Sequence, residues 1–113
     1  MTTIYHNPRC MKSRETLALL EEKNEDVTIV EYLKETPSKE ELTQIIGQLA
    51  IKPLQLIRKG EADFKEHFKG KELTDDQWID AMIQYPKLIE RPIVVKDGKA
   101  ALGRPPVQVL DIL

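Results

Sequence analysis

Cysteine is scarce in this sequence, and its scarcity excludes several kinds of thiol chemistry. The 113 residues contain one cysteine, Cys10, so the chain cannot close an internal disulfide. No Cys-x-x-Cys pair is present, because Ser13 stands at the fourth position of the motif. One cysteine and two histidines form no cluster with zinc spacing. We therefore expect no bound metal, a reducing compartment, and disulfide chemistry only with a partner thiol.

Long apolar runs, glycine-rich nucleotide loops and an excess of positive charge are also missing. No apolar stretch approaches the roughly 18 residues of a membrane helix, and the N-terminus has no signal-peptide core. The formal net charge of −2 provides no general attraction for nucleic acid or an anionic membrane. We expect a monomeric, cytoplasmic protein that binds neither nucleic acid nor membrane and holds no bound cofactor.

The sequence does have the composition of one ordinary globular domain. Hydrophobic residues make up 41% of the chain and charged residues 32%, a balance that argues against disorder. A chain of this size buries roughly two-thirds of its unfolded surface, which is enough for a core without disulfides. We therefore predict a single domain over residues 1–113.

The hydrophobic pattern predicts an α/β fold with a mixed sheet. Four segments rich in apolar and β-branched residues are predicted strands: 2–6, 27–32, 91–96 and 99–102. A helix is predicted between the first two, from about residue 10 or 11 to 23, so these strands form a right-handed βαβ unit. The second strand is mostly apolar and is expected to be buried. Asp97-Gly98 is a hairpin signal between the last two, and a final helix is expected over 107–113.

The segment from about 37 to 86 is predicted to be a helical block between the βαβ unit and the hairpin. Two capping boxes begin helices in it: Ser38 to Glu41 and Thr74 to Gln77. After the first box, apolar residues follow the spacing of an amphipathic helix: Leu42, Ile45, Ile46 and Leu49. Shorter helices are expected in two places: 53–57 and 62–68.

Cys10 lies in the turn between the first strand and the first helix, a position that activates thiols. Asn7-Pro8 supplies the turn, because proline fixes φ and asparagine tolerates unusual backbone angles. Helix N-termini and nearby cations lower the pKa of a cysteine from about 8.5 to roughly 3.5–7.5. Arg9, Lys12 and Arg14 lie within four residues of Cys10. The pattern therefore favours a reactive thiolate over a buried structural cysteine.

Three other arginines lie far from Cys10 in the sequence, each at the edge of a predicted element. Arg58 ends a short helix, Arg91 opens a strand and Arg104 follows one. Guanidinium groups bind tetrahedral oxyanions through paired hydrogen bonds, so the set suggests an anion site. For any one of them, the alternative is a solvated surface residue. A phosphatase loop of the form Cys-x5-Arg is excluded, because Thr16 occupies the arginine position.

Three further residues each allow two interpretations. His6 either favours the thiolate electrostatically or is a hydrogen-bonded histidine at the end of a strand. Ser13 either hydrogen-bonds a thiolate or ligand oxygen or simply begins the helix. Pro92 starts a strand, and only about 5–6% of X–Pro bonds in folded proteins are cis, so the residues alone favour a trans bond.

Five segments together carry the signature of a known family: 4–10 with 13–14, 56–59, 73–77, 89–95 and 103–105. They resemble the arsenate reductases that use glutathione and glutaredoxin, a branch of the thioredoxin-like fold. The resemblance covers essentially the whole chain. It implies a mixed four-stranded sheet flanked by helices, with a helical insertion before the C-terminal hairpin. Arg9 and Met11-Lys12 depart from close members, where small residues are usual.

The resemblance also implies roles for individual residues. Cys10 would attack arsenate, and His6 would help to keep it ionised. The oxyanion and its covalent adduct would be bound by three arginines: Arg58, Arg91 and Arg104. Ser13 is expected to contribute to substrate binding, and Asn7 to shape the site. Pro92 would be the cis-proline of thioredoxin-like folds, against the general preference for trans.

The resemblance implies partners as well. Glutathione would attack the adduct as a co-substrate, arsenite would leave, and glutaredoxin would clear the mixed disulfide on Cys10. Such a reaction belongs to arsenical resistance. Two alternatives remain: a glutathione-dependent thiol–disulfide oxidoreductase, and a thioredoxin-like regulator that binds RNA polymerase. Ser13 removes the dithiol switch that such regulators typically carry, so arsenate reduction is the leading hypothesis.

Overall fold

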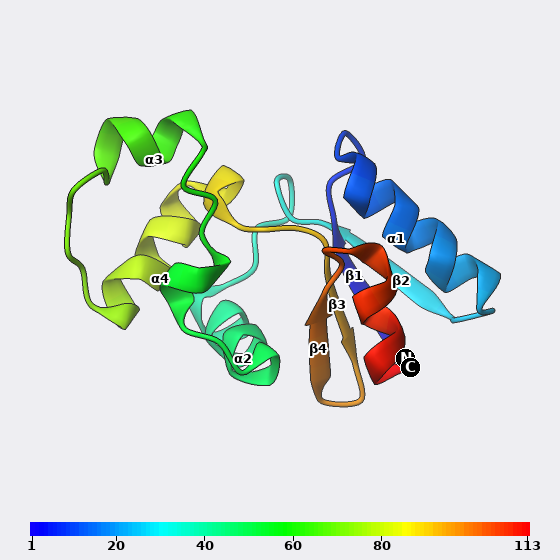
Figure 1. Cartoon of the computed structure of the whole chain (residues 1–113). Helices are drawn as coiled ribbons and strands as arrows, with labels where there is room; N and C mark the ends of the chain where they lie inside the picture. The colour runs from blue at the N-terminus through cyan, green and yellow to red at the C-terminus, as the bar shows by residue number, and fades with distance from the viewer. The chain divides into compact units, whose positions relative to one another are not determined.

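The computed structural model describes all 113 residues as an α/β protein (Figure 1). The chain divides into two compact units. The sheet unit comprises Met1–Glu35 and Arg91–Leu113, and the helical unit comprises Thr36–Glu90. That the whole chain forms one domain stays a prediction. None of the helices combines the length and apolar character needed to cross a membrane.

The sheet unit is built on a four-stranded mixed sheet. Its strands are β1 (Thr2–His6), β2 (Val27–Glu31), β3 (Ile93–Lys96) and β4 (Lys99–Leu102). They stand in the order β2-β1-β3-β4. β1 is parallel to β2 and antiparallel to β3, and β3 is antiparallel to β4. The mixed sheet and the βαβ unit expected from the sequence are therefore confirmed.

One face of this sheet is covered by α1 (Met11–Glu22) and the C-terminal 3₁₀ helix η3 (Pro106–Ile112) (Figure 1). Ile4 of β1 and Val94 of β3 are direct cross-strand partners, so their side chains share this face. Both are fully buried with Leu20 of α1 and Val109 of η3. These residues form the core that holds α1 against the sheet. The position of the first turn of α1 is fixed in the same way.

β2 is an edge strand and not the buried strand that its apolar sequence predicts. It pairs with β1 alone, and Ile29 in its middle is 48% exposed. A run of apolar residues is typical of a central strand, yet an edge strand has only one neighbour to cover it. The sequence pattern does not separate these two cases.

The β3–β4 hairpin turns at Asp97-Gly98, as predicted. The φ angles of these residues are 49° and 79°, and a type I′ turn needs positive φ at both central positions. The peptide bonds before Pro92 and Pro105 are cis. The cis bond at Pro92 is the one that the resemblance implied, against the general preference for trans.

The helical unit contains three α-helices and two 3₁₀ turns: α2 (Lys39–Leu49), η1 (Pro53–Leu56), α3 (Ala62–His67), α4 (Asp75–Gln84) and η2 (Pro86–Leu88). Both predicted capping boxes are present. Ser38 Oγ accepts from the Glu41 N–H, and Thr74 Oγ1 accepts from the Gln77 N–H. Each box satisfies N–H groups that the start of a helix leaves without an intrahelical partner.

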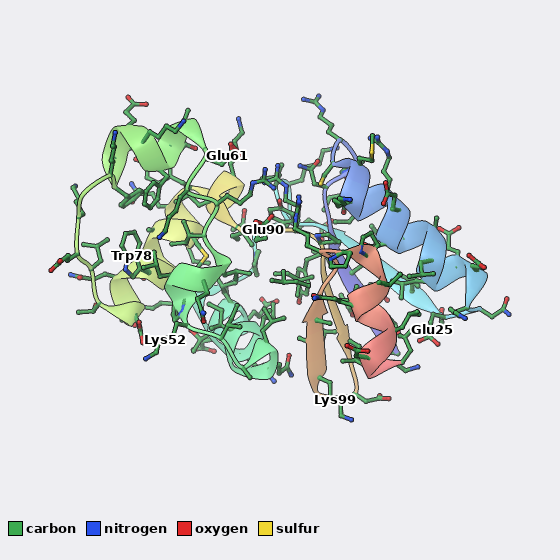
Figure 2. The ribbon with its side chains drawn as sticks, viewed as in Figure 1. Glu25, Lys52, Glu61, Trp78, Glu90 and Lys99 are labelled. Atoms are coloured by element: carbon green, nitrogen blue, oxygen red, sulfur yellow. The ribbon has the colours of Figure 1, made fainter.

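The core of the helical unit is apolar. Its buried side chains are Leu42, Ile45, Ile46, Leu56, Ile57, Trp78, Ile79, Ala81, Met82, Leu88 and Ile89. Trp78 of α4 (Figure 2) stacks on Phe64 of α3, with ring centroids 6.1 Å apart. This stacking attaches α3, which buries no residue of its own, to α4.

Arg58 does not end a helix, contrary to the sequence prediction. η1 ends at Leu56, and Ile57 forms an isolated antiparallel bridge with Ile89. The Arg58 N–H donates to the Leu88 carbonyl at 2.7 Å. Hydrogen bonding to a distant segment therefore replaces the helical turn that the glycine two residues later suggested.

Candidate active site

The turn between β1 and α1 places Cys10 at the N-cap of α1. The Cys10 N–H donates to the Asn7 carbonyl at 3.0 Å, and the Arg9 N–H donates to Asn7 Oδ1 at 3.0 Å. Asn7 is 7% exposed, so it braces the turn from inside the protein. The predicted position of Cys10 at the start of a helix is confirmed.

Ser13 joins β1 to α1 through its hydroxyl. Ser13 Oγ lies 2.6 Å from His6 Nδ1 and accepts from the Asn7 N–H at 3.0 Å. The residue is fully buried, with its hydroxyl engaged by His6 and Asn7. That Ser13 contributes to substrate binding stays a prediction. The backbone N–H of Ser13, and not its side chain, is the group that bonds the Cys10 sulfur.

Two distant arginines reach the thiol within the sheet unit. Arg104, just after β4, donates from Nη2 to Cys10 Sγ at 3.5 Å. Its Nε donates to the Arg91 carbonyl at 2.7 Å, which fixes the direction of the side chain. Arg91, just before β3, also hydrogen-bonds the Cys10 sulfur. The structure therefore brings together three predicted site residues that lie far apart in the sequence.

The thiol is poised to ionise. Burial alone raises the pKa of Cys10, but the opposing interactions are stronger together, and the net pKa is lowered from its ordinary value. The Ser13 N–H and the Arg91 side chain lower it through hydrogen bonds, and the charges of Arg104 and Arg91 lower it further. Hydrogen bonds and cations favour the charged form of an acid, so more thiolate is present at neutral pH.

The cations that lower this pKa are not those nearest in sequence. Arg9 and Lys12 are exposed, and neither is among the causes of the shift. Arg14 donates to the Pro8 carbonyl at 3.0 Å. The predicted activation of Cys10 is supported, but its physical origin differs from the local cluster of charge that the sequence suggested.

His6 lies at the end of β1 and is 6% exposed. Burial lowers its pKa, the Glu31 carboxylate acts in the opposite direction, and Arg14 lowers it further. A lowered pKa leaves the imidazole mostly neutral at pH 7. Of the two interpretations of His6, the structure supports the hydrogen-bonded histidine, because His6 Nδ1 bonds Ser13 Oγ and His6 is not among the causes of the Cys10 pKa shift. That His6 helps to keep Cys10 ionised stays a prediction.

Arg58 belongs to the helical unit, where its Nη1 pairs with Glu90 Oε1 at 3.0 Å. Glu90 lies on the connection that leads toward β3 (Figure 2). The two side chains are 28% and 24% exposed, so the pair is partly shielded from water. The predicted role of Arg58 in anion binding stays a prediction.

Sequence reasoning missed the close contact of Gly103 with Thr16 and Pro92. A Cβ atom at position 103 would lie 2.6 Å from Pro92 Cγ and would also overlap Thr16 Oγ1. Thr16 is fully buried on α1. Periodicity predicts only that a residue is buried and says nothing of such an approach; the one signal was a glycine directly before Arg104.

The arrangement suits a nucleophilic sulfur that meets an anion. A thiolate at a helix N-terminus is a nucleophile, and guanidinium groups beside it can receive anionic oxygens. No group of three or more His, Cys, Asp or Glu side chains gathers that could hold a metal ion.

Comparison with known proteins shows the family. The ArsC family model matches residues 5–112. The chain belongs to the ArsC family. An arsenate reductase of Acidiphilium multivorum is 43% identical over 112 residues, covering 98% of this chain and 79% of that protein. A protein of Escherichia coli K12 named YfgD is 47% identical over 115 residues, covering 97% of this chain and 94% of that one.

Solved structures agree with this assignment. The structure named arsenate reductase from Vibrio cholerae has a TM-score of 0.95 and 49% identity. The match covers 99% of this chain and 97% of that chain. The thioredoxin-like α/β fold, with its mixed four-stranded sheet flanked by helices, is therefore confirmed for this ArsC-family protein.

Proposed function

We propose that this protein reduces arsenate to arsenite, with Cys10 as the nucleophile. The observation that carries the proposal is the 3.5 Å hydrogen bond from Arg104 Nη2 to Cys10 Sγ. It joins a group suited to oxyanion binding to a thiol of lowered pKa. The ArsC-family relatives named arsenate reductases support arsenate as the oxyanion.

The first step would form a bond between sulfur and arsenic. The Cys10 thiolate attacks the arsenic atom, and one arsenate oxygen takes up protons and leaves as water. Arsenic stays pentavalent in the resulting thiol–arsenate adduct. Arg91 and Arg104 would hold the remaining oxygens and offset the negative charge that gathers on them during attack.

The second step would transfer two electrons to arsenic. A glutathione thiolate attacks the Cys10 sulfur, an S–S bond forms, and the S–As bond breaks with its electron pair left on arsenic. Arsenite, now trivalent, departs. A glutaredoxin thiolate then attacks the glutathione sulfur of the mixed disulfide and releases the Cys10 thiolate. Glutathione acts as a co-substrate, and we propose no bound cofactor.

The external thiols follow from the cysteine content. Cys10 is the only cysteine of the chain, so no second thiol of its own can resolve the adduct. We propose that the protein works as a monomer in the cytoplasm, where such thiols are kept reduced.

Arg58 would be the third oxyanion ligand that the resemblance implies. Its ion pair with Glu90 uses Nη1. A guanidinium carries several further N–H donors, so pairing with a carboxylate and binding an anion are compatible. Arg58→Ala should raise the KM for arsenate, and an unchanged KM would remove Arg58 from the site.

Arsenite release tests the proposal directly. Purified protein would be incubated with arsenate, glutathione and glutaredoxin, and arsenite would be quantified; Cys10→Ser should abolish its formation. Reduction of glutathionylated substrates without any arsenite would select the thiol–disulfide oxidoreductase. Absence of both activities, with capture of RNA polymerase subunits, would select the regulator.

A further inference from the structure

Gly103 occupies a position where no side chain fits. A Cβ atom there would lie 2.6 Å from Pro92 Cγ and 3.2 Å from Pro92 Cδ, and it would overlap Thr16 Oγ1. Neither neighbour is the loose end of a flexible chain, because Pro92 is a closed ring and Thr16 is fully buried. The glycine is required by this close approach and not by a left-handed backbone, which Gly98 has at φ 79°.

Hydrogen bonds hold each partner in this contact. The Gly103 N–H donates to the Pro92 carbonyl at 2.9 Å. Thr16 Oγ1 donates to the Lys12 carbonyl at 2.8 Å, which fixes the rotamer that faces the glycine. The end of β4, the start of β3 and the first turns of α1 therefore meet where the side chains of Thr16 and Pro92 press against the backbone of Gly103.

The same three segments carry the groups that surround the thiol. Cys10 begins α1, Arg91 precedes β3, and Arg104 directly follows Gly103. Arg104 bonds both others, with Nε on the Arg91 carbonyl at 2.7 Å and Nη2 on Cys10 Sγ at 3.5 Å. A displacement at Gly103 would therefore be passed on to these two hydrogen bonds.

We propose that Gly103 is a positioning residue for the nucleophile: its missing side chain lets the end of β4 lie against Thr16 and Pro92, and this contact holds the Arg104 guanidinium on Cys10 Sγ.

A side chain at position 103 would separate α1 from the end of β4. Thr16 and Cys10 lie on α1, whereas Gly103 and Arg104 are adjacent in the chain after β4. An atom inserted between Thr16 and Gly103 would push α1 away from the end of β4. The gap between Cys10 Sγ and Arg104 Nη2 would open, and a hydrogen bond already 3.5 Å long would be lost.

The consequence is measurable at the thiol itself. The side-chain charges that lower the pKa of Cys10 are those of Arg91 and Arg104, since the exposed Arg9 and Lys12 do not contribute. His6 bonds Ser13 Oγ and is not among the causes of the Cys10 shift. Loss of the Arg104 contact should therefore raise the thiol pKa, whereas burial of the sulfur would continue to oppose ionisation.

The experiment compares two glycine substitutions. Gly103→Ala should raise the pKa of Cys10, measured from thiolate absorbance against pH, by about one unit. Gly47→Ala is the matched control, because nothing lies within 4 Å of a Cβ at position 47 of α2. The control should leave the thiol pKa unchanged. A folded Gly103→Ala protein with an unshifted pKa would overturn the proposal.

A double-mutant cycle separates positioning from a general structural role. If Gly103 acts through Arg104, then Gly103→Ala should shift the pKa little further in a protein that already carries Arg104→Ala. Equal shifts in both backgrounds would show that the glycine acts by another route and would overturn the proposal.

A second variant covers the case in which Gly103→Ala does not fold. Thr16→Ile presses on the same contact from α1 and leaves Gly103 in place. It should also raise the thiol pKa, and Thr16→Ser, which keeps the hydroxyl, should not. A folded Thr16→Ile protein with an unshifted pKa would contradict the proposal.

Only the effect on turnover rests on the proposed function. If positioning is correct and arsenate is the substrate, then Gly103→Ala should also lower arsenite formation near neutral pH. The thiol titrations need no arsenate, so a protein inactive toward arsenate would leave this inference fully testable.

Discussion

The two units of the molecule bury different kinds of side chain. Every buried polar residue lies in the sheet unit: Thr2, His6, Asn7, Ser13 and Thr16. The helical unit buries only apolar side chains. Burying a polar group is unfavourable unless it is hydrogen-bonded, so a buried polar cluster demands exact partners. The sheet unit has these partners, and most of them surround the turn that carries Cys10.

This difference shows what the site requires. The ring of His6, the amide of Asn7 and the hydroxyl of Ser13 form one buried network behind the thiol. Apolar packing alone would fill the space, but it would not fix the direction of backbone N–H groups. Such preorganisation is the usual reason why a functional site keeps polar groups that a core would otherwise exclude.

The largest expected effect is on the free energy of unfolding, in a variant whose thiol pKa should not change. Met82 is fully buried in the helical unit, so Met82→Ala should lower the free energy of unfolding by about 2–5 kcal/mol through the cavity that it leaves. The thiol pKa, titrated without denaturant, should stay unchanged, because the residues that set it lie in the sheet unit.

Methionine also provides the matched control. Met11, at the start of α1, is 63% exposed and so leaves no cavity in the core when it is shortened. Met11→Ala should therefore change stability by less than about 0.5 kcal/mol. A shifted thiol pKa in Met82→Ala would contradict the separation between the two units.

The opposite pattern is expected when a site arginine is removed. Arg91→Ala should lower kcat/KM for arsenate by roughly 30-fold or more, because a charged donor is lost from a partly dry site. This corresponds to a loss of transition-state stabilisation of about 2 kcal/mol or more. It should also raise the thiol pKa, since Arg91 both bonds the sulfur and acts on it by charge. Arg9→Ala should not shift the pKa, although Arg9 adjoins Cys10 in sequence.

Disrupting the buried polar network should cause a smaller loss, which is measured as the free energy of unfolding. Ser13→Ala removes the hydroxyl that bonds His6 Nδ1 and the Asn7 N–H. Two buried polar groups would lose their partner, so chemical denaturation should show a loss of about 1–3 kcal/mol. Thr43→Ala removes a hydroxyl that bonds the Lys39 carbonyl on an exposed face of α2 and should have little effect. Equal losses in both variants would argue against a special role for buried polar groups.

The fold was largely predictable because its signals are local. Capping boxes at Ser38 and Thr74, the Asp97-Gly98 turn and the apolar periodicity each depend on a few neighbouring residues. The errors arose where tertiary structure decides the outcome. β2 is exposed because it is an edge strand, and Arg58 follows a bridge to a distant segment.

The sequence predicted the members of the site and the help of helix N–H groups, which the Ser13 N–H provides, but it did not predict which cations act on the thiol. The turn before α1 identified Cys10, and the family resemblance singled out Arg91 and Arg104. Sequence neighbours suggested that the charges of Arg9, Lys12 and Arg14 activate the thiol, whereas the charges that do so are those of Arg91 and Arg104, near β3 and β4. Proximity in the chain is a poor guide to proximity in space for long cationic side chains, which extend into solvent unless something holds them.

The smallest effect should appear in the pH dependence of stability. The pKa of Cys10 is lower in the folded protein than its ordinary value, so the folded state binds this proton less tightly than the unfolded chain does. The stabilisation is therefore complete above the unfolded pKa, near about 8.5, and is lost as pH falls through the folded pKa. Because the thiol is only partly buried, solvent screening keeps the effect modest.

Subtracting a variant without the thiol isolates this contribution. The difference in unfolding free energy between wild type and Cys10→Ser should rise in favour of wild type as pH increases from the folded pKa to about 8.5, and then level off. The same subtraction made in an Arg104→Ala background should rise less, because one of the charges that lower the pKa is missing. If this difference does not change with pH in the wild-type background, then the folded protein does not favour the thiolate. The proposed chemistry depends on a nucleophile of lowered pKa and would then lose its basis.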